Sequence, residues 1–282
     1  LEAATGYSNL KGKAALYYPS LAALVGNPEK ASIDLAFNSI NLGIQDAYYF
    51  SPTLKSDPYI KKFARKKLRA SLYASGQMNQ VNLKKLSAKW GKTTLVSMTG
   101  KFAEPLSMDQ NSWDVKEFNF ISTKDDLDSF LPGDSLGIQY PDKIDLALST
   151  EGSPGEFSLK SKLKGYNGTL ELAGNMALKE DAYLYDLTIL VASMPLGEIL
   201  RDTNTYGNFG MDVSVKGNTG PLEDLDLHLE TKVNNLVYNG HNYKGLTLNG
   251  DILDGKGDIE LKHEDDFLDL EVLTSVSLDT AH

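Results

Sequence analysis

Residues 211–229, which read MDVSVKGNTGPLEDLDLHL, contain the pattern that decides the fold. Met211, Val213 and Val215 alternate with polar or charged residues, and the same alternation returns over 225–229. Period-two alternation is typical of a strand with one buried face, and the glycines and proline between the two runs favour a turn. The stretch therefore predicts a β-hairpin.

Two earlier stretches repeat this pattern, reading LRASLYASGQMNQVNLKKL over 68–86 and IDLALSTEGSPGEFSLKSKL over 144–163. Each consists of an alternating strand, a glycine, a short polar turn and a second alternating strand. Their starting points and Met211 lie roughly 70 residues apart, which is longer than common solenoid periods but follows the same logic. We therefore predict one elongated repeat array, with approximate repeats 1–67 (partial), 68–137, 138–207 and 208–282.

Tight turns and short helices are expected between these strands. The positive backbone angles of hairpin turns are favoured at Asn167-Gly168, Asn239-Gly240, Asn249-Gly250 and Asp254-Gly255.

Helical spacing of apolar residues predicts short helices within 125–137 and 195–207, and 57–68 is the best helix candidate in the first third of the chain. The acidic pair Asp125 and Asp126 is interpreted as the N-cap and first turn of its helix, where negative charge meets exposed backbone N–H groups.

Composition excludes several classes of protein. The 282 residues are 41% hydrophobic and 23% charged, which is typical of a folded chain. The net charge of -10 argues against nucleic acid as a partner, because phosphate binding requires a basic surface. The absence of cysteine excludes disulfides and thiolate chemistry. No apolar run is long enough to cross a bilayer, so we predict no transmembrane segment in this sequence.

No group of residues has the pattern of a catalytic or metal site. The nucleophile elbow, the phosphate loop and the dinucleotide fingerprint are all absent. His228 falls on the polar side of its strand and His241 in a hairpin turn, while the run HEDD at 263–266 lacks the spacing of a calcium loop and is interpreted as a solvated acidic turn. We predict no enzymatic activity, no catalytic or metal-binding residue and no cofactor.

The alternating strands raise the question of what covers their apolar side. Such a strand hides one face and exposes the other to water, and the few short helices are too small to cover so much apolar sheet. Three architectures would solve this problem: two sheets packed as a sandwich, a closed barrel, or one long sheet curled into a groove. The residue pattern leaves all three open.

The order of elements resembles the AsmA superfamily, and within it the TamB-like proteins. The resemblance rests on the three glycine-interrupted hairpins, on the LPLG-like segments FLPGDSLG (130–137) and MPLGEIL (194–200), and on the series TKVNNLVYNGHNYKGLTLNGDILDGKGDIELKHEDD (231–266). It covers roughly residues 31–278. The Tyr- and Asn-rich turns are similar in style to those of relatives in Bacteroidetes-type bacteria.

This resemblance implies an all-β fold in which a long twisted antiparallel sheet of repeated hairpins, with a few short helices, is curled into a U-shaped, β-taco-like groove. It also implies a non-catalytic segment of a periplasmic lipid conduit or scaffold. Such a segment would hold phospholipid or another acyl-chain lipid for transport between the inner and outer membranes and for outer-membrane assembly. The full-length protein would have an inner-membrane anchor that is absent here, and would act with an outer-membrane barrel partner.

The lipid-facing residues expected in such a groove are the aligned members of the alternating strands. They are Leu146, Leu148, Phe157, Leu159, Leu170, Leu172, Met211, Val213, Val215, Leu225, Leu227, Leu229, Leu246 and Leu248. The main alternative is a structural or adhesive β-sandwich module that binds protein or glycan at its surface. A third hypothesis, a carbohydrate-active enzyme, predicts clustered carboxylates in a cleft.

Overall fold

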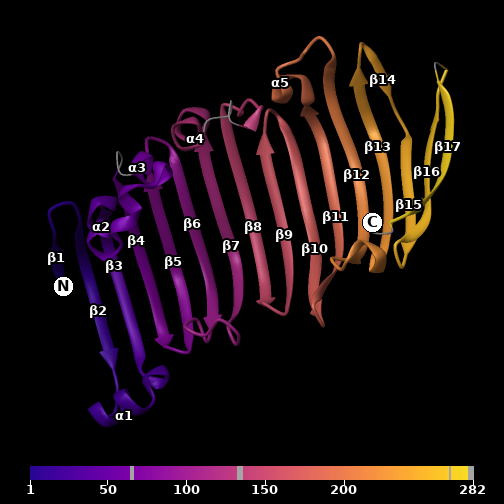
Figure 1. The fold of residues 1–282 in the computed structure, drawn as a ribbon. Helices are drawn as coiled ribbons and strands as arrows, with labels where there is room; N and C mark the ends of the chain where they lie inside the picture. The colour runs from indigo at the N-terminus through magenta and orange to yellow at the C-terminus, as the bar shows by residue number, and fades with distance from the viewer. Residues whose placement is uncertain (64–66, 132–135, 267, 279–282) are drawn as a thin grey trace. The chain divides into compact units, whose positions relative to one another are not determined.

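The structure is a computed structural model that describes residues 1–63, 67–131, 136–266 and 268–278. Its seventeen strands form a single antiparallel sheet that is open rather than closed on itself (Figure 1). With 63% of the chain in strands and 14% in helices, the prediction of an all-β fold with a few short helices is confirmed. Contacts divide the chain into unit 1, residues 1–136 and 142–153, and unit 2, residues 137–141 and 154–282.

Unit 1 is a meander in which each strand pairs with the next strand along the chain. This order follows from the short turns, because a strand that reverses within a few residues must lie beside its predecessor. The strands are β1 (Glu2–Ala4), β2 (Asn9–Tyr17), β3 (Ser32–Leu42), β4 (Leu68–Gln77), β5 (Gln80–Trp90), β6 (Thr94–Ala103), β7 (Ser112–Thr123) and β8 (Lys143–Ser153).

The helices that the structure describes in unit 1 are short and lie between strands. They are α1 (Leu21–Gly26), η1 (Pro28–Lys30), η2 (Ile44–Asp46), α2 (Ala47–Phe50), η3 (Pro52–Lys55), α3 (Pro58–Phe63) and α4 (Lys124–Phe130). The helix predicted over 57–68 is therefore present as α3, but Leu68 is already the first residue of a strand, and residues 64–66 lie outside the described part.

Asp126 fixes α4 to the turn between β5 and β6. Its buried carboxylate accepts hydrogen bonds from the backbone N–H groups of Lys92, Thr93 and Thr94 at 3.0, 2.7 and 3.0 Å, and from the hydroxyls of both threonines. The interpretation of this residue as a capping charge was therefore incomplete. Thr123 occupies the N-cap position, and the oxygens of Asp126 bind a neighbouring hairpin.

Unit 2 continues the meander. Its strands are β9 (Glu156–Gly165), β10 (Gly168–Lys179), β11 (Ala182–Pro195), β12 (Tyr206–Asn218), β13 (Leu227–Tyr238), β14 (His241–Tyr243), β15 (Leu246–Leu253), β16 (Lys256–Glu264) and β17 (Asp269–Ser277). Among the described residues of unit 2, two short helices join these strands, α5 (Leu196–Leu200) and η5 (Leu222–Asp224). β14 and β15 both pair with β13, so that they share one flank of that strand.

The hairpin turns agree in part with the predicted Gly-containing pairs. Asn239-Gly240 and Asp254-Gly255 both have positive φ angles, as tight hairpins require. The first predicted turn is displaced by one residue, because the positive angles fall on Tyr166 and Asn167. The turn predicted at Asn249-Gly250 was wrong, since both residues lie inside β15 and pair with β13 and β16.

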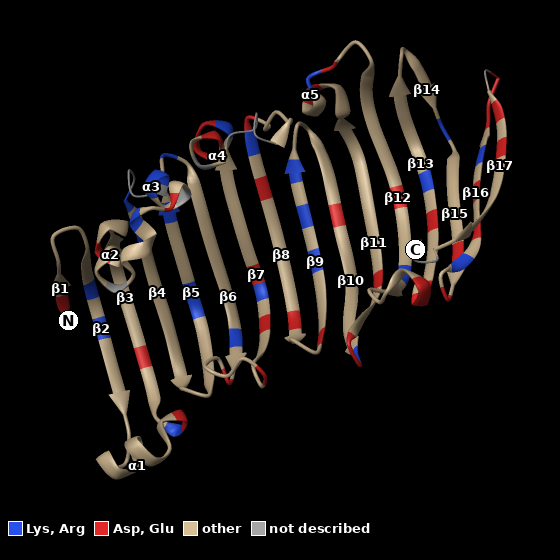
Figure 2. Ribbon diagram, in the orientation of Figure 1, with Lys and Arg blue, Asp and Glu red and all other residues tan. Residues whose placement is uncertain are grey.

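A similar series of elements occurs twice along the chain. β4 to β7 and α4 lie within 68–137, and β8 to β11 and α5 lie within 138–207. Each series is four strands followed by one short helix. Charged residues occur along the strands of both units and near their ends (Figure 2).

Candidate functional site

The apolar side chains of unit 2 form continuous rows that cross its strands. Directly paired residues in an antiparallel sheet project from the same face, so the register identifies each row. One row contains Leu172, Ile189, Val213, Thr231, Leu248, Leu261 and Val272, one from each of seven strands. We call the side of unit 2 that carries this row its apolar face.

The register places most of the predicted groove residues on this face. They are Phe157, Leu159, Leu170, Leu172, Met211, Val213, Val215, Leu227, Leu229, Leu246 and Leu248. Leu225 differs from them, because it follows η5 and precedes the first residue of β13. The tight η5 turn interrupts the alternation that the run Leu225-Leu227-Leu229 indicated.

The apolar face also contains residues that the sequence pattern did not reveal. Leu187, Ile189 and Val191 of β11 pair with the predicted residues of β12. The alternation of apolar and polar residues is weak in β11, because Leu184 and Leu190 lie on its other face and make the run almost continuously apolar.

Unit 1 has an equivalent apolar face that includes the predicted residues Leu146 and Leu148. One of its rows contains Phe37, Leu72, Leu86, Met98, Phe118 and Leu148. A parallel row contains Ile40, Ala70, Ala88, Val96, Phe120 and Leu146. Unit 1 therefore presents aromatic and aliphatic side chains together.

Three bulges keep the apolar residues of unit 1 on one face. The register shifts in β3, β5 and β7 at Asn38-Ser39, Lys84-Lys85 and Lys116-Glu117. At each place two consecutive polar residues stand opposite one partner residue, which is the count of a β-bulge. In a regular strand, apolar side chains three positions apart would project from opposite faces, and the bulge brings them to the same face.

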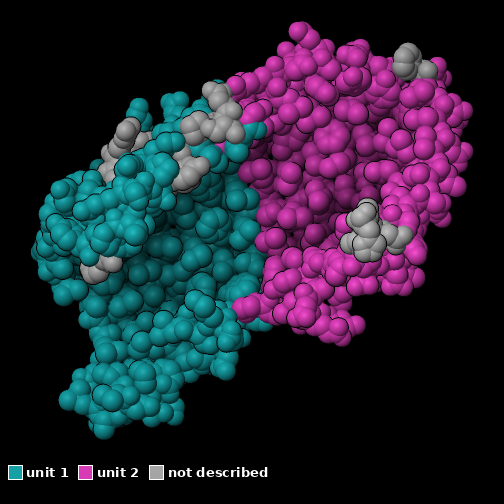
Figure 3. Space-filling view, in the orientation of Figure 1, with its two compact units in different colours: residues 1–136, 142–153 teal, residues 137–141, 154–282 magenta. Residues whose placement is uncertain are grey.

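Within each unit, the described residues place no second layer over this face. All fourteen predicted residues are partly buried, and none is fully buried or fully exposed. The surface accessible to water is 17445 Å², whereas a compact protein of 30.9 kDa exposes about 12,000 Å². Few apolar side chains in the described part are fully buried, among them Leu83, Val115 and Ile252. Figure 3 shows each unit hollowed on its visible side.

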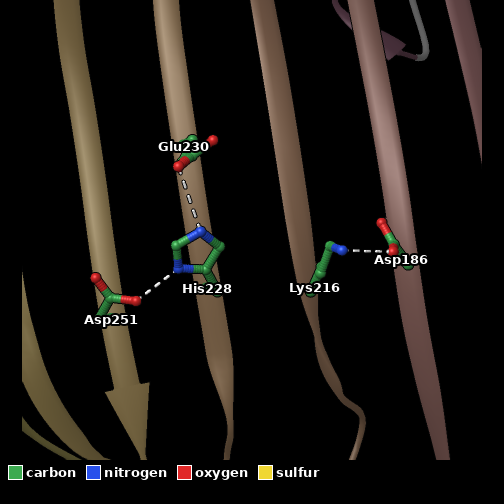
Figure 4. A network of polar contacts seen from close by, with 5 residues as sticks. All are labelled: Asp186, Lys216, His228, Glu230 and Asp251. Carbon is green, nitrogen blue, oxygen red and sulfur yellow. Dashed lines mark hydrogen bonds and ion pairs between the residues drawn. The ribbon is translucent and has the colours of Figure 1, made fainter.

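The opposite face of unit 2 is polar. Lys216 pairs with Asp186 at 2.8 Å, and His228 Nδ1 lies 2.6 Å from Asp251 Oδ1. Figure 4 draws these residues with the strands in the reverse left-to-right order from Figure 1, so it views the side that Figures 1 and 3 hide. The hollow of unit 2 in Figure 3 is therefore its apolar face.

The polar face perturbs the titration of its exposed groups. The hydrogen bond to Asp251 raises the pKa of His228, with smaller support from Glu230. Hydrogen bonding to Asp186 likewise raises the pKa of Lys216. These pairs stay in contact with water, and their geometry is that of cross-strand pairs which stabilise a sheet surface.

The histidines of β14 and β16 form a small cluster at one end of the apolar face. His241 Nε2 and His263 Nε2 each lie 3.0 Å from Asp265 Oδ2, and the rings of Tyr243 and His263 are 5.5 Å apart. The side chain of His263 is buried, so the interpretation of this run as a fully solvated turn was wrong. His241 belongs to a strand rather than to the turn before it.

The described residues contain no group of three or more His, Cys, Asp or Glu side chains able to hold a metal ion. A hollow of about 400 Å³ lies where the ends of β12, β13 and β15 meet, and its lining mixes apolar Leu227 and Ile252 with charged Lys216 and Asp251. Such a mixed lining differs from the rows described above, which contain no charged residue.

Comparison with protein-family models, with curated proteins and with solved structures found no match for this chain. Within the described ranges, no helix combines the length and the apolar character needed to span a bilayer. The apolar face is therefore the feature on which a functional hypothesis has to be built.

Proposed function

We propose that this chain is a non-catalytic segment of a periplasmic lipid conduit or scaffold. In this proposal, the apolar rows hold the acyl chains of phospholipid or a similar lipid during transport between the inner and outer membranes and during outer-membrane assembly. The single observation that carries it is the wide apolar sheet face without a second layer. The resemblance to the AsmA superfamily supplies the compartment, the inner-membrane anchor and the outer-membrane barrel partner.

Acyl chains suit this face because the face offers area without directional contacts. Strands of ten to fourteen residues, such as β9 and β11, extend about 33 to 46 Å, which is longer than a single acyl chain. Burying each methylene contributes about 0.8 kcal/mol. This free energy is spread over many residues of the apolar face. Loss of a single methyl group from one of these side chains should therefore have little effect on lipid affinity.

An apolar sheet face is usually covered by a second sheet. The hypothesis of an adhesive β-sandwich module requires such a second sheet packed on the apolar face. In the described part of the chain, all strands belong to one sheet. No observation favours that hypothesis over the lipid proposal.

The test compares two adjacent residues of β11. Ile189 lies on the apolar face and is partly buried, whereas Thr188 lies on the polar face and is exposed. Native mass spectrometry and exchange with a fluorescent phospholipid would be measured for Ile189→Glu and Thr188→Glu. We expect the first substitution to reduce bound lipid at least about fivefold and the second to leave it unchanged, because only the first places a charge among acyl chains.

Circular dichroism would establish that both variants fold. If Ile189→Glu does not fold, Ile189→Trp replaces it, since a bulky apolar residue fills the face without adding charge. Absence of lipid from the unsubstituted protein under exchange conditions would overturn the proposal. Equal lipid loss in the two glutamate variants would do the same.

A further inference from the structure

Basic residues gather on the polar face of unit 1, over the strands from β2 to β5 (Figure 2). The register places them opposite the apolar rows, except that Lys84 stands beside Lys85 in the bulge of β5. In the sequence of these four strands, the single acidic residue is Asp34, and Glu2 of β1 stands opposite Lys11. We call this set the basic patch, and its members, all exposed, are Lys11, Lys13, Arg69, Lys84, Lys85 and Lys89.

The charges of the basic patch are not offset by neighbouring side chains. Elsewhere on the polar faces, lysines form ion pairs with carboxylates, and these lysines are Lys116, Lys162, Lys216 and Lys262. Across the ranges that the structure describes, no member of the basic patch forms such a pair. The patch therefore presents its positive charge to whatever approaches this face.

Two of the cations face each other directly. Arg69 of β4 is the register partner of Lys89 of β5. Like charges directly opposite each other on neighbouring strands destabilise a sheet. This pair therefore contributes nothing favourable to folding, and a local conflict of this kind indicates a functional role for the charges.

A strip of small polar side chains crosses the strands between the cations. Ser71 of β4 pairs with Ser87 of β5, which pairs with Ser97 of β6, and all three are partly exposed. Along β5, Lys85 and Lys89 stand two positions to either side of Ser87, about 14 Å apart. A serine hydroxyl both donates and accepts hydrogen bonds. The face therefore offers a neutral hydrogen-bonding strip with positive charge on both sides.

This arrangement favours a narrow anionic partner with hydroxyl groups. The net charge of -10 opposes the approach of a wide anionic surface such as a bilayer. Neighbouring strands lie about 4.8 Å apart, whereas an extended peptide advances only about 3.4 Å per residue. The length of one sugar unit in a linear glycan is close to the strand spacing, so successive sugars would meet successive strands.

We propose that the basic patch of unit 1 binds an acidic glycan that lies across β2 to β5. The sugar hydroxyls contact the serine strip, and the anionic groups contact the cations on either side of it. Lysine is a point charge without the planar fork of arginine, so carboxylate, sulfate and phosphate groups all suit the patch. The patch is independent of lipid binding because it lies opposite the apolar rows, and it is no strand edge because β3, β4 and β5 are each paired on both flanks.

The experiment measures fluorescence anisotropy of labelled hexagalacturonate with the 282-residue chain at low ionic strength. Maltohexaose has the same number of sugars without charge, and an end-blocked hexaglutamate peptide has the same number of carboxylates on a peptide backbone. We expect hexagalacturonate to bind at least about tenfold more tightly than either control. A heparin hexasaccharide forms a second arm. Binding of either acidic glycan supports the proposal, and the tighter of the two identifies the preferred anionic group.

Substitutions test whether the patch itself is responsible. Lys89→Gln removes one patch charge, and Lys216→Gln in β12 changes the net charge equally outside the patch. We expect hexagalacturonate affinity to fall at least about threefold in K89Q and about tenfold in the double variant R69Q/K89Q, and to stay within about 1.5-fold in K216Q. K89Q and the double variant should not lower the melting temperature, because both relieve the repulsion between paired cations. Lys13→Gln in β2 is the substitute if the double variant does not fold.

Four results would overturn the proposal. They are equal binding of maltohexaose and hexagalacturonate, equal binding of hexaglutamate and hexagalacturonate, equal losses in K89Q and K216Q, and absence of binding by both acidic glycans. In the last case, binding of vesicles that contain phosphatidylglycerol, weakened in K89Q, would identify a bilayer as the occupant instead.

Discussion

Individual residues stabilise this sheet through contacts between segments that are distant in sequence. Asp126 is the clearest case, since it is a buried carboxylate whose acceptors are filled by backbone and hydroxyl groups of the β5–β6 turn. Hydrogen bonds to a charged group are stronger than neutral ones. Removing the carboxylate takes the acceptor away from several backbone N–H and hydroxyl donors of this turn. Asp125, the preceding residue, is exposed.

Replacing Asp126 by Ala should therefore lower the free energy of unfolding of unit 1 by about 2 to 4 kcal/mol. Asp125→Ala is the matched control and should cost less than about 1 kcal/mol, because it loses only an exposed charge near a helix N-terminus. Urea denaturation followed by circular dichroism measures both values. Equal destabilisation by the two substitutions would contradict the role assigned to Asp126.

The His228–Asp251 pair makes a prediction about pH at the residue scale. Its hydrogen bond raises the pKa of His228 above the ordinary value of 6.5 in the folded protein. Because the folded-state pKa is the higher one, the stabilisation is fully present below the unfolded-state pKa and is lost as the pH rises through the folded-state pKa.

An NMR titration of the His228 ring should therefore give a midpoint above 6.5. Asp251→Asn should lower this midpoint, and Glu230→Gln should lower it less, since Asp251 makes the dominant contact. A midpoint that does not change in Asp251→Asn would show that another cause is responsible.

At the scale of elements, the bulges decide how the strands of unit 1 keep one apolar face. In β5 the apolar residues are Val81 and Leu83 before the bulge, and Leu86, Ala88 and Trp90 after it. Two polar residues, rather than one, separate Leu83 from Leu86. This spacing explains why simple alternation identified the face of β8 in the sequence and missed that of β5.

Deleting Lys84 should be tolerated, because the strand then alternates without interruption and every apolar residue keeps its face. Deleting Ser87 from the same strand should be severe, since it turns Ala88 and Trp90 to the polar face. We expect deletion of Lys84 to lower the free energy of unfolding by about 1 kcal/mol or less. Deletion of Ser87 should lower it by more than about 3 kcal/mol. Thermal unfolding of the two deletion variants measures this difference, and similar melting temperatures would contradict it.

For the whole molecule, the surface exposed to water is larger than that of a compact chain of the same mass. The accessible surface of 17445 Å² is the measure of this excess, as a compact chain of the same mass exposes about 12,000 Å². Whatever covers the faces should gain free energy in proportion to its apolar length.

Binding of fatty acids should therefore strengthen with chain length if the lipid proposal is correct. An upper limit of about 0.8 kcal/mol per methylene corresponds to about fifteenfold in affinity for every two carbons added. Isothermal titration calorimetry with acids of increasing length, below their micellar concentrations, measures the slope. A slope near zero would argue against acyl-chain burial, and the Ile189→Glu variant should show a reduced slope.

Much of this architecture was predictable from local patterns. Alternation around Met211, Val213 and Val215, together with glycine-containing turns, indicated antiparallel hairpins and assigned these side chains to one face. Helix ends and bulges were less predictable, because Leu68 and the pair Lys84-Lys85 depend on how neighbouring strands pair. The burial of His263 was missed because the acidic residues after it indicated a solvated turn, although His263 continues the alternation of Ile259 and Leu261.

The amino-acid pattern was sufficient to specify an all-β meander and the face on which most of its apolar residues lie. It left open whether that face meets a second sheet, closes on itself or stays uncovered, and the fold resolves this by placing all strands in one open sheet. The physical reason is that alternation encodes the direction of a side chain relative to its own strand. What that side chain contacts depends on segments far away in the sequence. The hydrogen bond from Thr93 N–H to the Asp126 carboxylate is an example.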